Sequence, residues 1–513
     1  MHGSWLFVAA SALVLASAQD CPNYVDYYRQ SHEPLSSGQY KLAYQRATLS
    51  CRTFNSSDVE DTLTRMESVI KDPDLYRLFQ NSYPNTLDTA IKWRGVADDN
   101  PNEELTFVIT GDINAMWLRD SSNQMQSYLP LLQATSDRDS IASLYRGVIN
   151  LQARYLLTSP YCNSFQPPVE SKIPPAVNDA ADRDVVFPGY DESKVFECKY
   201  ELDSLAAFLE VSENYYKATE DISFFGSFKW VQAIEAILKV AEDQMTPTYG
   251  PDGAVLAQPF TFVRYTTRAT ETLANDGIGN PVANGTGLVR SAFRPSDDST
   301  IFQLFIPANM MFSAYLSSTA DIMSKLNTSN SGALAERMKS LSQSIPDAIE
   351  THGTVTHPDY GQVYAFEVDG FGGQTIMDDA NIPSLLSAPF NTYNVNPETY
   401  RNTRALVLGA TNPYFMRGPV INSVGGPHQG PGKAWPMASI VRILTSDNDD
   451  EIVAELREIV SSTAGLGLIH ESINSFNATD YTRPWFSWAN GLFGQMILDL
   501  EQRKPELLAT SFQ

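Results

Sequence analysis

Five short segments of the chain concentrate carboxylates, tryptophans, arginines and glycines, which are residue types that can do chemistry together. They span residues 110–120 (TGDINAMWLRD), 293–298 (FRPSDD), 364–381 (with YAFEVDGFG and MDDAN), 426–436 (GPHQGPGKAWP) and 470–490 (HES at its start, TRPWFSWAN at its end). Carboxylates accept hydrogen bonds from sugar hydroxyls, and Arg and Asn add donors. Tryptophan offers a flat apolar face to a pyranose ring. Two carboxyl groups that flank a glycosidic oxygen suffice for hydrolysis, one as acid and one as base or nucleophile.

Each of these segments also has a purely structural interpretation. A capped helix with an Arg–Asp pair accounts for residues 110–120, and an Asx cap accounts for one of Asp297 and Asp298. Trp485 and Trp488 are three residues apart, which is more typical of a helix core than of a sugar platform. Two adjacent carboxylates are harder to explain by capping alone, so a sugar-active site remains the sharper hypothesis.

Signatures of other catalytic classes do not occur in the sequence. There is no HExxH and no GxSxG. Residues 426–433 resemble a phosphate loop, but Pro427 stands where the first glycine is required and Ala434 replaces the Ser or Thr that would hold magnesium. His352 and His357 are five residues apart, off one helical face. We therefore expect neither a metal nor an organic cofactor.

Most of the chain has apolar residues at three- and four-residue spacing, which predicts helices. The predicted helices cover residues 58–71, 87–94, 118–133, 138–157, 201–217, 224–244, 300–317, 332–350, 397–408, 433–446, 448–462 and 485–502. Strand-like alternation is limited to residues 105–110, 258–265 and 362–368. Long loops are expected near residues 165–195, 246–298 and 409–432. About a dozen helices without a βαβ rhythm indicate an all-α domain: an (α/α) barrel, a solenoid or an irregular bundle. No internal repeat supports the solenoid.

The composition excludes some partners. The 513 residues include 36 Lys+Arg and 60 Asp+Glu, a formal net charge of −24. Such a surface repels phosphate, so neither nucleic acid nor anionic lipid is an expected partner. Hydrophobic residues make up 43% of the chain and charged residues 19%, which predicts a sizeable core rather than a coiled coil or a disordered chain.

The N-terminus predicts a secretory signal. Residues 5–18 (WLFVAASALVLASA) are apolar but fall short of the about 20 residues that span a membrane. They end in Ala16-Ser17-Ala18, a small-x-small cleavage pattern. We expect a signal peptide over residues 1–18, a single catalytic domain over 19–513, no stable membrane insertion, and a location outside the cell or in the lumen of the secretory pathway.

The cysteines and sequons agree with that compartment. Four cysteines predict two disulfides with three possible connectivities; Cys21–Cys51 and Cys162–Cys198 are the choice that is local in sequence. Four sequons are compatible with N-glycosylation on surface loops: Asn55, Asn284, Asn327 and Asn477.

Taken together and in order, the five segments resemble glycoside hydrolase family 125. The matching words are GDINAMWLRDS, FRPSDDS, YAFEVDGFG with MDDANIPSLL, GPHQGPGKAWPM, and HES with TRPWFSWANGLFGQMILDL. They extend over residues 110–500, and the chain is most similar in kind to the secreted fungal branch. The resemblance implies an (α/α)6 barrel with long decorating loops and a few short strands. It also implies an exo-acting α-mannosidase that prefers α-1,6 linkages, inverts the anomeric configuration and uses no metal. Its substrates would be mannose-containing oligosaccharides or glycoprotein glycans.

The resemblance also assigns roles to residues. The general base maps to Glu471 and the general acid to Asp297 or Asp298; the spacing to the Glu favours Asp298, with its neighbour orienting it or binding sugar. An inverting pair would be separated by roughly 6.5–9.5 Å. Asp203 lies on a predicted helix from which it could reach the cavity. The residues expected to line or shape the sugar site are Asp112, Trp117, Arg119, Asp120, Glu367, Asp369, His428, Trp435 and Arg483.

Two departures from the family pattern and three alternatives remain. Asn114 stands where Pro is expected, and the region 246–298 is long, which could alter access to the site. One alternative is another (α/α)-barrel glycosidase, for instance a glucoamylase-like enzyme with a different sugar or linkage preference. The others are a carbohydrate-binding protein without catalysis and a metal hydrolase built on the Asp pairs.

Overall fold

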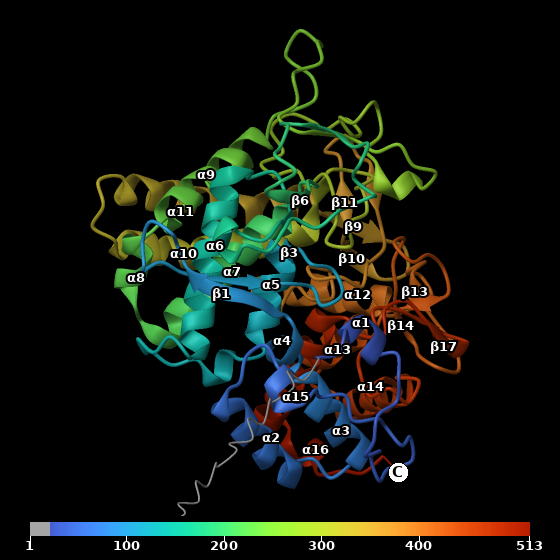
Figure 1. Cartoon of the computed structure of the whole chain (residues 1–513). Coiled ribbons are helices and arrows are strands. Elements are labelled where there is room, and N and C mark those ends of the chain that lie inside the picture. The colour runs from blue at the N-terminus through green and yellow to red at the C-terminus, as the bar shows by residue number, and fades with distance from the viewer. Residues whose placement is uncertain (1–20, 513) are drawn as a thin grey trace, which may run out of the picture.

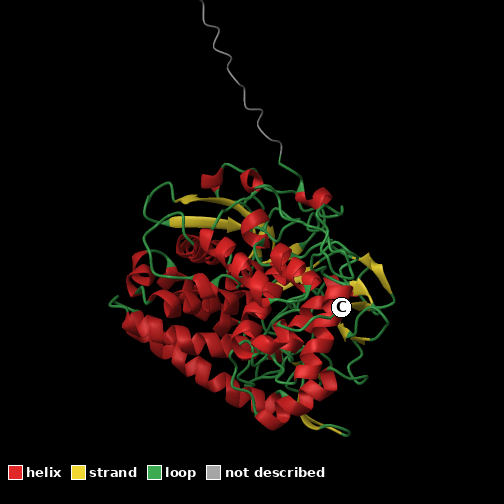
Figure 2. Ribbon diagram, turned by 90° about the horizontal axis from the view of Figure 1, so that it is seen from below, coloured by secondary structure: helices red, strands yellow, loops and turns green. Residues whose placement is uncertain are grey.

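The computed structural model describes residues 21–512, so the predicted signal peptide lies outside the described residues. Helices dominate the described chain, and the strands are short (Figures 1 and 2). No helix within residues 21–512 has the length and apolar character needed to cross a membrane.

The helices alternate between an inner and an outer layer. The inner helices are α5 (Leu118–Gln126), α7 (Leu202–Thr219), α10 (Ile306–Lys325), α13 (Pro436–Leu444) and α15 (Ser487–Arg503). The outer ones are α3 (Pro73–Ser82), α6 (Ile141–Thr158), α9 (Trp230–Asp243), α11 (Ser331–His352), α12 (Pro397–Val407) and α14 (Asp449–Ser461). Inner helices pack side by side in the order α13, α15, α5, α7, α10, and α3, α6, α11 and α14 each pack on an inner helix. This is the (α/α)6 barrel that the resemblance implied.

A turn-rich stretch takes the sixth inner position in chain order. Residues 385–392, between α11 and α12, form turns instead of a helix. The Asp378 carboxylate holds the start of this stretch, because it accepts hydrogen bonds from the amides of Leu385 (2.8 Å) and Leu386 (3.0 Å). A buried carboxylate thus does the work of a helix cap here.

The chain closes on itself through its two ends. The N-terminal helices α2 (Ser57–Val69) and α3 lie next to the C-terminal α15, blue beside red in Figure 1. The remaining helices are short: α1 (Tyr24–Tyr27), α4 (Asn85–Thr89), α8 (Ile222–Ser227) and α16 (Pro505–Leu508), with 3-10 turns at Leu49–Cys51, Leu129–Leu131, Val169–Ser171 and Ala269–Glu271.

Short antiparallel strands guide the chain into the inner helices. The strand β3 (Met116–Trp117) enters α5 directly, β8 (Leu304–Phe305) enters α10, and β15 (Lys433–Ala434) leads into α13. Their partners are β4 (Ser164–Phe165) and β6 (Val195–Glu197), β11 (Glu367–Val368) and β12 (Gln374–Thr375), and β16 (Ile473–Asn474) and β17 (Asn477–Tyr481). These sheets bring the segments before the inner helices to one end of the barrel.

The other strands form two-stranded pairs in the loops. They are β1 (Ile91–Val96) with β2 (Glu104–Val108), β5 (Val185–Phe187) with β7 (Thr261–Val263), β9 (Thr354–His357) with β10 (Gly361–Tyr364), and β13 (Phe415–Met416) with β14 (Ser423–Val424).

Most predicted elements are confirmed, with two exceptions. The helix expected at 87–94 is wrong, because Ile91 and Trp93 pair with Val108 and Phe107 in the β1–β2 hairpin. Helix α3 was not predicted. The strands expected at 105–110 and 258–265 are present as β2 and β7, whereas the one expected at 362–368 is two strands, β10 and β11, in different sheets. The three long loops are present, each with short strands or turns in it. Trp485 and Trp488 are both 1% exposed, in agreement with their structural interpretation.

Both disulfides join the cysteines that are local in sequence, Cys21–Cys51 and Cys162–Cys198. The second disulfide closes the loop around 165–195 and holds the adjacent residues Asn163 and Lys199 near each other. The four sequon asparagines are all exposed.

Gly147 gives a test of how the outer helix α6 packs on β2. A Cβ at this position would lie 2.7 Å from the backbone nitrogen of Thr106, which cannot swing away. Alanine is otherwise favoured over glycine within a helix by about 1 kcal/mol. We expect the clash to win, so Gly147→Ala should lower the free energy of unfolding by about 1–3 kcal/mol in chemical denaturation.

The matched control is Gly332→Ala in the first turn of α11. A Cβ there meets no atom of the described residues within 4 Å. This variant should be neutral or stabilised by up to about 1 kcal/mol. Equal effects of the two substitutions would contradict the packing described for α6.

Candidate active site

A small cavity of about 60 Å³ lies at the end of the barrel where the inner helices begin. Trp117, Trp435 and Phe486 each precede the first residue of an inner helix (α5, α13 and α15) and line this cavity. The full lining is Thr110, Ile113, Trp117, Arg119, Asp120, Pro295, Ser296, Asp297, Asn381, His428, Trp435, Glu471, Arg483 and Phe486. Four of the five sequence segments, and Asn381 of the fifth, thus meet in one place.

A wider cleft continues the cavity outward. It shares Ile113, Trp117, Asp297, His428 and Arg483 with the inner cavity, and it adds Asp112, Phe196, Lys199 and Arg264 among others. The site therefore has an enclosed inner compartment and an open outer one, with Asp297, His428 and Arg483 at their junction.

Glu471 forms one side of the inner cavity. It is 7% exposed, and its Oε2 accepts hydrogen bonds from Thr482 Oγ1 (2.9 Å) and Gln429 Nε2 (3.4 Å). The Arg483 guanidinium lies 3.4 Å from Glu471 Oε1 and 3.2 Å from Asp112 Oδ2, an ion pair that ties the inner cavity to the outer cleft. These contacts hold a carboxylate in a fixed direction, as a general base requires.

Asp297 forms another side of the cavity, at the tip of a tight turn. Its φ is +65°, a left-handed conformation that few non-glycine residues adopt. The turn is closed by hydrogen bonds from the amide of Asp297 to the carbonyl of Arg294 (2.9 Å) and from the amide of Arg294 to the carbonyl of Asp298 (2.8 Å). This turn places Asp297 on the cavity lining, whereas Asp298 is buried behind two lining residues, Ser296 and His428.

Two buried side chains hold Asp297 from behind. Asn163 Nδ2 donates to Asp297 Oδ1 (3.1 Å), and Lys199 Nζ donates to the Asp297 carbonyl (3.0 Å). Asn163 follows Cys162 and Lys199 follows Cys198, so the second disulfide fastens both supports. Although burial opposes ionisation, the charges of Lys199 and Arg119 lower the pKa of Asp297.

Asp298 is 1% exposed and does not line the cavity. It accepts a hydrogen bond from Ser296 Oγ (3.3 Å), and its Oδ1 lies 3.7 Å from Nδ1 of His428. The His428 side chain keeps 30% exposure and lines both compartments. Burial disfavours the imidazolium, but Asp298, followed by Glu471 and Asp297, outweighs burial and raises the pKa of His428.

This contact predicts a measurable pKa change. Because a negative charge favours the protonated imidazole, Asp298→Asn should lower the pKa of His428. Nitrogen-15 NMR titration of the imidazoles measures it directly. Asp369→Asn is the matched control, since Asp369 makes its hydrogen bonds in the loop at Phe371 and Gly373. An unchanged His428 pKa in Asp298→Asn would contradict the pairing.

Arg119 organises the floor of the cavity. Its Nη1 lies 2.7 Å from Glu201 Oε2 and 3.0 Å from Asp203 Oδ2, and its Nη2 lies 3.2 Å from Asp120 Oδ2. All four side chains are at most 5% exposed. One cation faces three carboxyl groups and cannot compensate the burial of all of them. Burial therefore outweighs the attraction to Arg119 and raises the pKa of Asp120, of Glu201 and of Asp203, the last to about 6.

Several buried polar atoms at the cavity lack a hydrogen-bond partner among the described residues: Thr110 Oγ1, Trp117 Nε1, Trp435 Nε1 and Asn381 Oδ1. Buried polar atoms are costly to leave unpaired. Donors and acceptors spread around one small cavity match a ligand that carries several hydroxyl groups.

The structure does not place Glu367 and Asp369 on the cavity. Glu367 is fully buried in an ion pair with Arg294 Nε (2.6 Å) and accepts hydrogen bonds from the amides of Ile301 and Phe302. It supports the segment that carries Asp297. Asp203 likewise lies behind Arg119. The other predicted residues line the inner cavity, except Asp112, which lines the outer cleft, and Asp298.

Sequence reasoning missed several residues that bear on the site. Asn381 and Phe486 lie within the conspicuous segments MDDAN and TRPWFSWAN, but neither residue type alone indicates catalysis. Glu201, Asn163 and Lys199 carry no motif of their own, but the acidic pair in Tyr200-Glu-Leu-Asp203 was a signal that pointed to Glu201.

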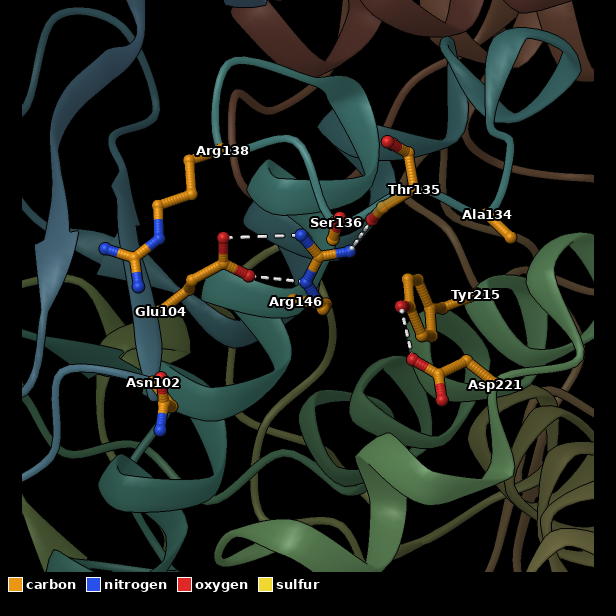
Figure 3. A pocket seen from close by; sticks show the side chains of 9 residues that line it. All are labelled: Asn102, Glu104, Ala134, Thr135, Ser136, Arg138, Arg146, Tyr215 and Asp221. Atoms are coloured by element: carbon orange, nitrogen blue, oxygen red, sulfur yellow. Dashed lines mark hydrogen bonds and ion pairs between the residues drawn. The ribbon is translucent and has the colours of Figure 1, made fainter.

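A separate pocket elsewhere contains none of the predicted residues (Figure 3). There Arg146 pairs with Glu104 and donates to the Thr135 carbonyl (2.8 Å), and Tyr215 donates to Asp221 (3.3 Å). Within residues 21–512, no three His, Cys, Asp or Glu side chains are grouped to hold a metal ion.

Comparison with known proteins gives three concordant findings. The profile of the family described as metal-independent α-mannosidase (GH125) matches residues 72–498. The meiotically up-regulated gene 157 protein of Schizosaccharomyces pombe is 47% identical over 491 residues, which are 95% of this chain and 94% of that protein. A structure from Streptococcus pneumoniae, described as a metal-independent α-mannosidase in a non-productive complex with α-1,6-mannobiose, is 33% identical with a TM-score of 0.77. That match covers 87% of this chain and 99% of that one.

Proposed function

Since this chain belongs to glycoside hydrolase family 125, the metal-independent α-mannosidases, we propose that it removes α-1,6-linked mannose from the non-reducing ends of mannose-containing oligosaccharides or glycoprotein glycans, with inversion. The observation that carries the proposal is that Asp297 and Glu471 line one small cavity, whose third carboxyl group, Asp120, is paired with the buried Arg119. The complex of the S. pneumoniae enzyme with α-1,6-mannobiose supports the choice of linkage.

Asp297 is the general acid in this proposal and Glu471 the general base. The carboxylic acid of Asp297 gives its proton to the glycosidic oxygen as the bond from that oxygen to C1 breaks. Glu471 takes a proton from the water that attacks C1 from the opposite face. The products are the shortened glycan and β-mannose, with Asp297 ionised and Glu471 protonated. The sequence spacing favoured Asp298 as the acid; we choose Asp297 because it lines the cavity and Asp298 does not.

The two compartments support exo-action. The enclosed inner cavity would hold the terminal mannose, whose hydroxyls pair with the unpartnered Thr110, Trp117 and Trp435 atoms. The outer cleft would hold the remaining glycan. Asp297 lines both compartments, as an acid that acts on the bond between them must.

A linkage panel tests this function. The protein is incubated with α-1,2-, α-1,3- and α-1,6-mannobiose and with maltose, with and without a chelator, and the released monosaccharide is measured. Mannose should appear fastest from the α-1,6 substrate, and the chelator should not slow it. Preference for another linkage, or glucose from maltose, would favour another (α/α)-barrel glycosidase. Binding without turnover would indicate a carbohydrate-binding protein.

We further propose that the protein acts outside the cell or in the lumen of the secretory pathway. The apolar residues 5–18, two disulfides and four exposed sequon asparagines support this. Treatment of the native protein with an N-glycan-removing enzyme should increase its gel mobility; an unchanged mobility would count against it.

A further inference from the structure

Behind Asp297 lies a second carboxyl group, Glu201, which no sequence motif assigns. It precedes the first residue of α7, is 1% exposed and does not line the cavity. Its carboxyl group lies close to that of Asp297, because a single nitrogen, Asn163 Nδ2, donates to both. Two carboxyl groups this close favour a state in which one of them carries a proton.

The surroundings fix this pair in place. Asn163 Nδ2 donates to Glu201 Oε1 and to Asp297 Oδ1, at 3.1 Å each. The amide cannot be reversed, because Asn163 Oδ1 accepts the Lys199 amide (3.1 Å). The other oxygen of Glu201 accepts from Arg119 Nη1 (2.7 Å) and Ser204 Oγ (3.0 Å).

We propose that Glu201 and Asp297 share a single proton, and that Glu201 is the positioning residue that stores this proton and passes it to Asp297 when sugar fills the cavity. This inference rests on the proposed function, because Asp297 is its general acid. It explains how an acid placed among cations starts each turnover protonated.

The charges around the pair decide where the proton rests. The titratable and charged groups that face Glu201 and Asp297 from the neighbouring elements are Arg119, Asp120, Asp203, Lys199, His428 and Arg483. Burial raises the pKa of Glu201 well above its ordinary value, whereas Lys199 and Arg119 lower that of Asp297 against the effect of burial. Asp297 faces the open cavity beside the Lys199 ammonium, whereas Glu201 is sealed inside the protein, so in the open cavity the proton rests on Glu201.

Bound sugar reverses this preference. A sugar in the cavity excludes water from Asp297, which disfavours its charge. Glu201, by contrast, keeps its hydrogen bonds from Arg119, Ser204 and Asn163, which stabilise its carboxylate. The proton moves from Glu201 to Asp297, and from there to the leaving oxygen. After the reaction the ionised pair takes one proton from solvent and Glu471 releases one, so the cycle balances.

The pH profile of Glu201→Gln tests this role. Glutamine keeps the size and a donor toward Asp297 but stores no proton. The alkaline limb of kcat/KM on α-1,6-mannobiose should move down by about one pH unit or more. At the optimum, kcat should fall by about ten- to a hundredfold. Hydrolysis of α-mannosyl fluoride, whose leaving group needs no proton, should be largely retained.

Asp203→Asn is the matched control. Asp203 is equally buried, also pairs with Arg119, and has no shared donor with Asp297. Its removal should shift the alkaline limb clearly less than Glu201→Gln does. Equal shifts of the alkaline limb of kcat/KM in the two variants would overturn the proton-storing role. So would a loss of activity in Glu201→Gln that is the same at all pH values and on both substrates.

Proton counting on the wild-type protein is a second test that needs no variant to fold. Binding of thio-linked α-1,6-mannobiose, a neutral ligand that is not hydrolysed, is measured by calorimetry in buffers of different ionisation enthalpy. A shared proton predicts almost no net uptake near neutral pH, and Glu201→Gln should take up a substantial fraction of a proton. Uptake of a full proton by the wild type would overturn the inference while leaving the proposed function intact.

Discussion

Replacement of Glu471 by Gln is expected to lower kcat on α-1,6-mannobiose by about a hundred- to ten-thousandfold without loss of fold. Glutamine fills the same space but cannot take a proton from water. The loss of kcat in Glu471→Gln should be as large on α-mannosyl fluoride, because hydrolysis of either substrate needs an activated water. Initial rates on both substrates, with a thermal unfolding curve for each variant, measure this.

Thr482→Val is the matched control for Glu471. It removes the 2.9 Å hydrogen bond that orients the carboxylate, together with the contacts of Thr482 Oγ1 to the amide (3.2 Å) and the hydroxyl (3.0 Å) of Ser472, and leaves the carboxylate itself in place. We expect a clearly smaller loss, since the base itself remains. If Glu471→Gln kept most of its activity on either substrate, the base would have to lie elsewhere.

Replacement of Asp297 by Asn should slow the hydrolysis of α-1,6-mannobiose far more than that of α-mannosyl fluoride. Hydrolysis of α-1,6-mannobiose needs a proton on its leaving oxygen and should fall by about a hundred- to ten-thousandfold. Fluoride leaves without one, so α-mannosyl fluoride should lose far less. The ratio of the two losses, measured at the pH optimum, separates an acid from a residue that only binds sugar.

Asp298→Asn is the control adjacent in sequence. Asp298 acts on the cavity through His428 and should show a smaller loss, similar on both substrates. The opposite pattern, with a selective loss for Asp298→Asn and a mild effect for Asp297→Asn, would make Asp298 the acid. It would also remove the basis for proton sharing with Glu201.

Periodicity predicted the helices well where their apolar faces meet the core, as in α6, α7 and α11. It failed at residues 87–94, where pairing with β2 decided the conformation of Ile91 and Trp93. Helix α3 carried a clear start signal, since Asp72 accepts hydrogen bonds from the amides of Asp74 and Leu75 just before Pro73. An Asp directly before a Pro is a start signal that can be read from the sequence alone.

The sequence segments that form the site were predictable, but the arrangement of their side chains around the cavity was not. Asp297 and Asp298 are neighbours of the same type, and only the left-handed turn determines which one lines the cavity. Glu367 stood in a conspicuous word, yet it pairs with Arg294, 73 residues away, and supports the site from behind. No local pattern predicts a pairing over that distance. Glu201 gained its importance from the same kind of long-range contact, through Asn163.

The anomeric form of the first product tests the central claim, that Asp297 and Glu471 act on an α-mannoside from opposite faces. Proton NMR follows α-1,6-mannobiose from the first minutes after the protein is added. The account predicts that β-mannose appears first and only later mutarotates to the α form. If α-mannose appeared first, the two carboxyl groups would be a retaining pair about 5 Å apart, and the mechanism described would be contradicted.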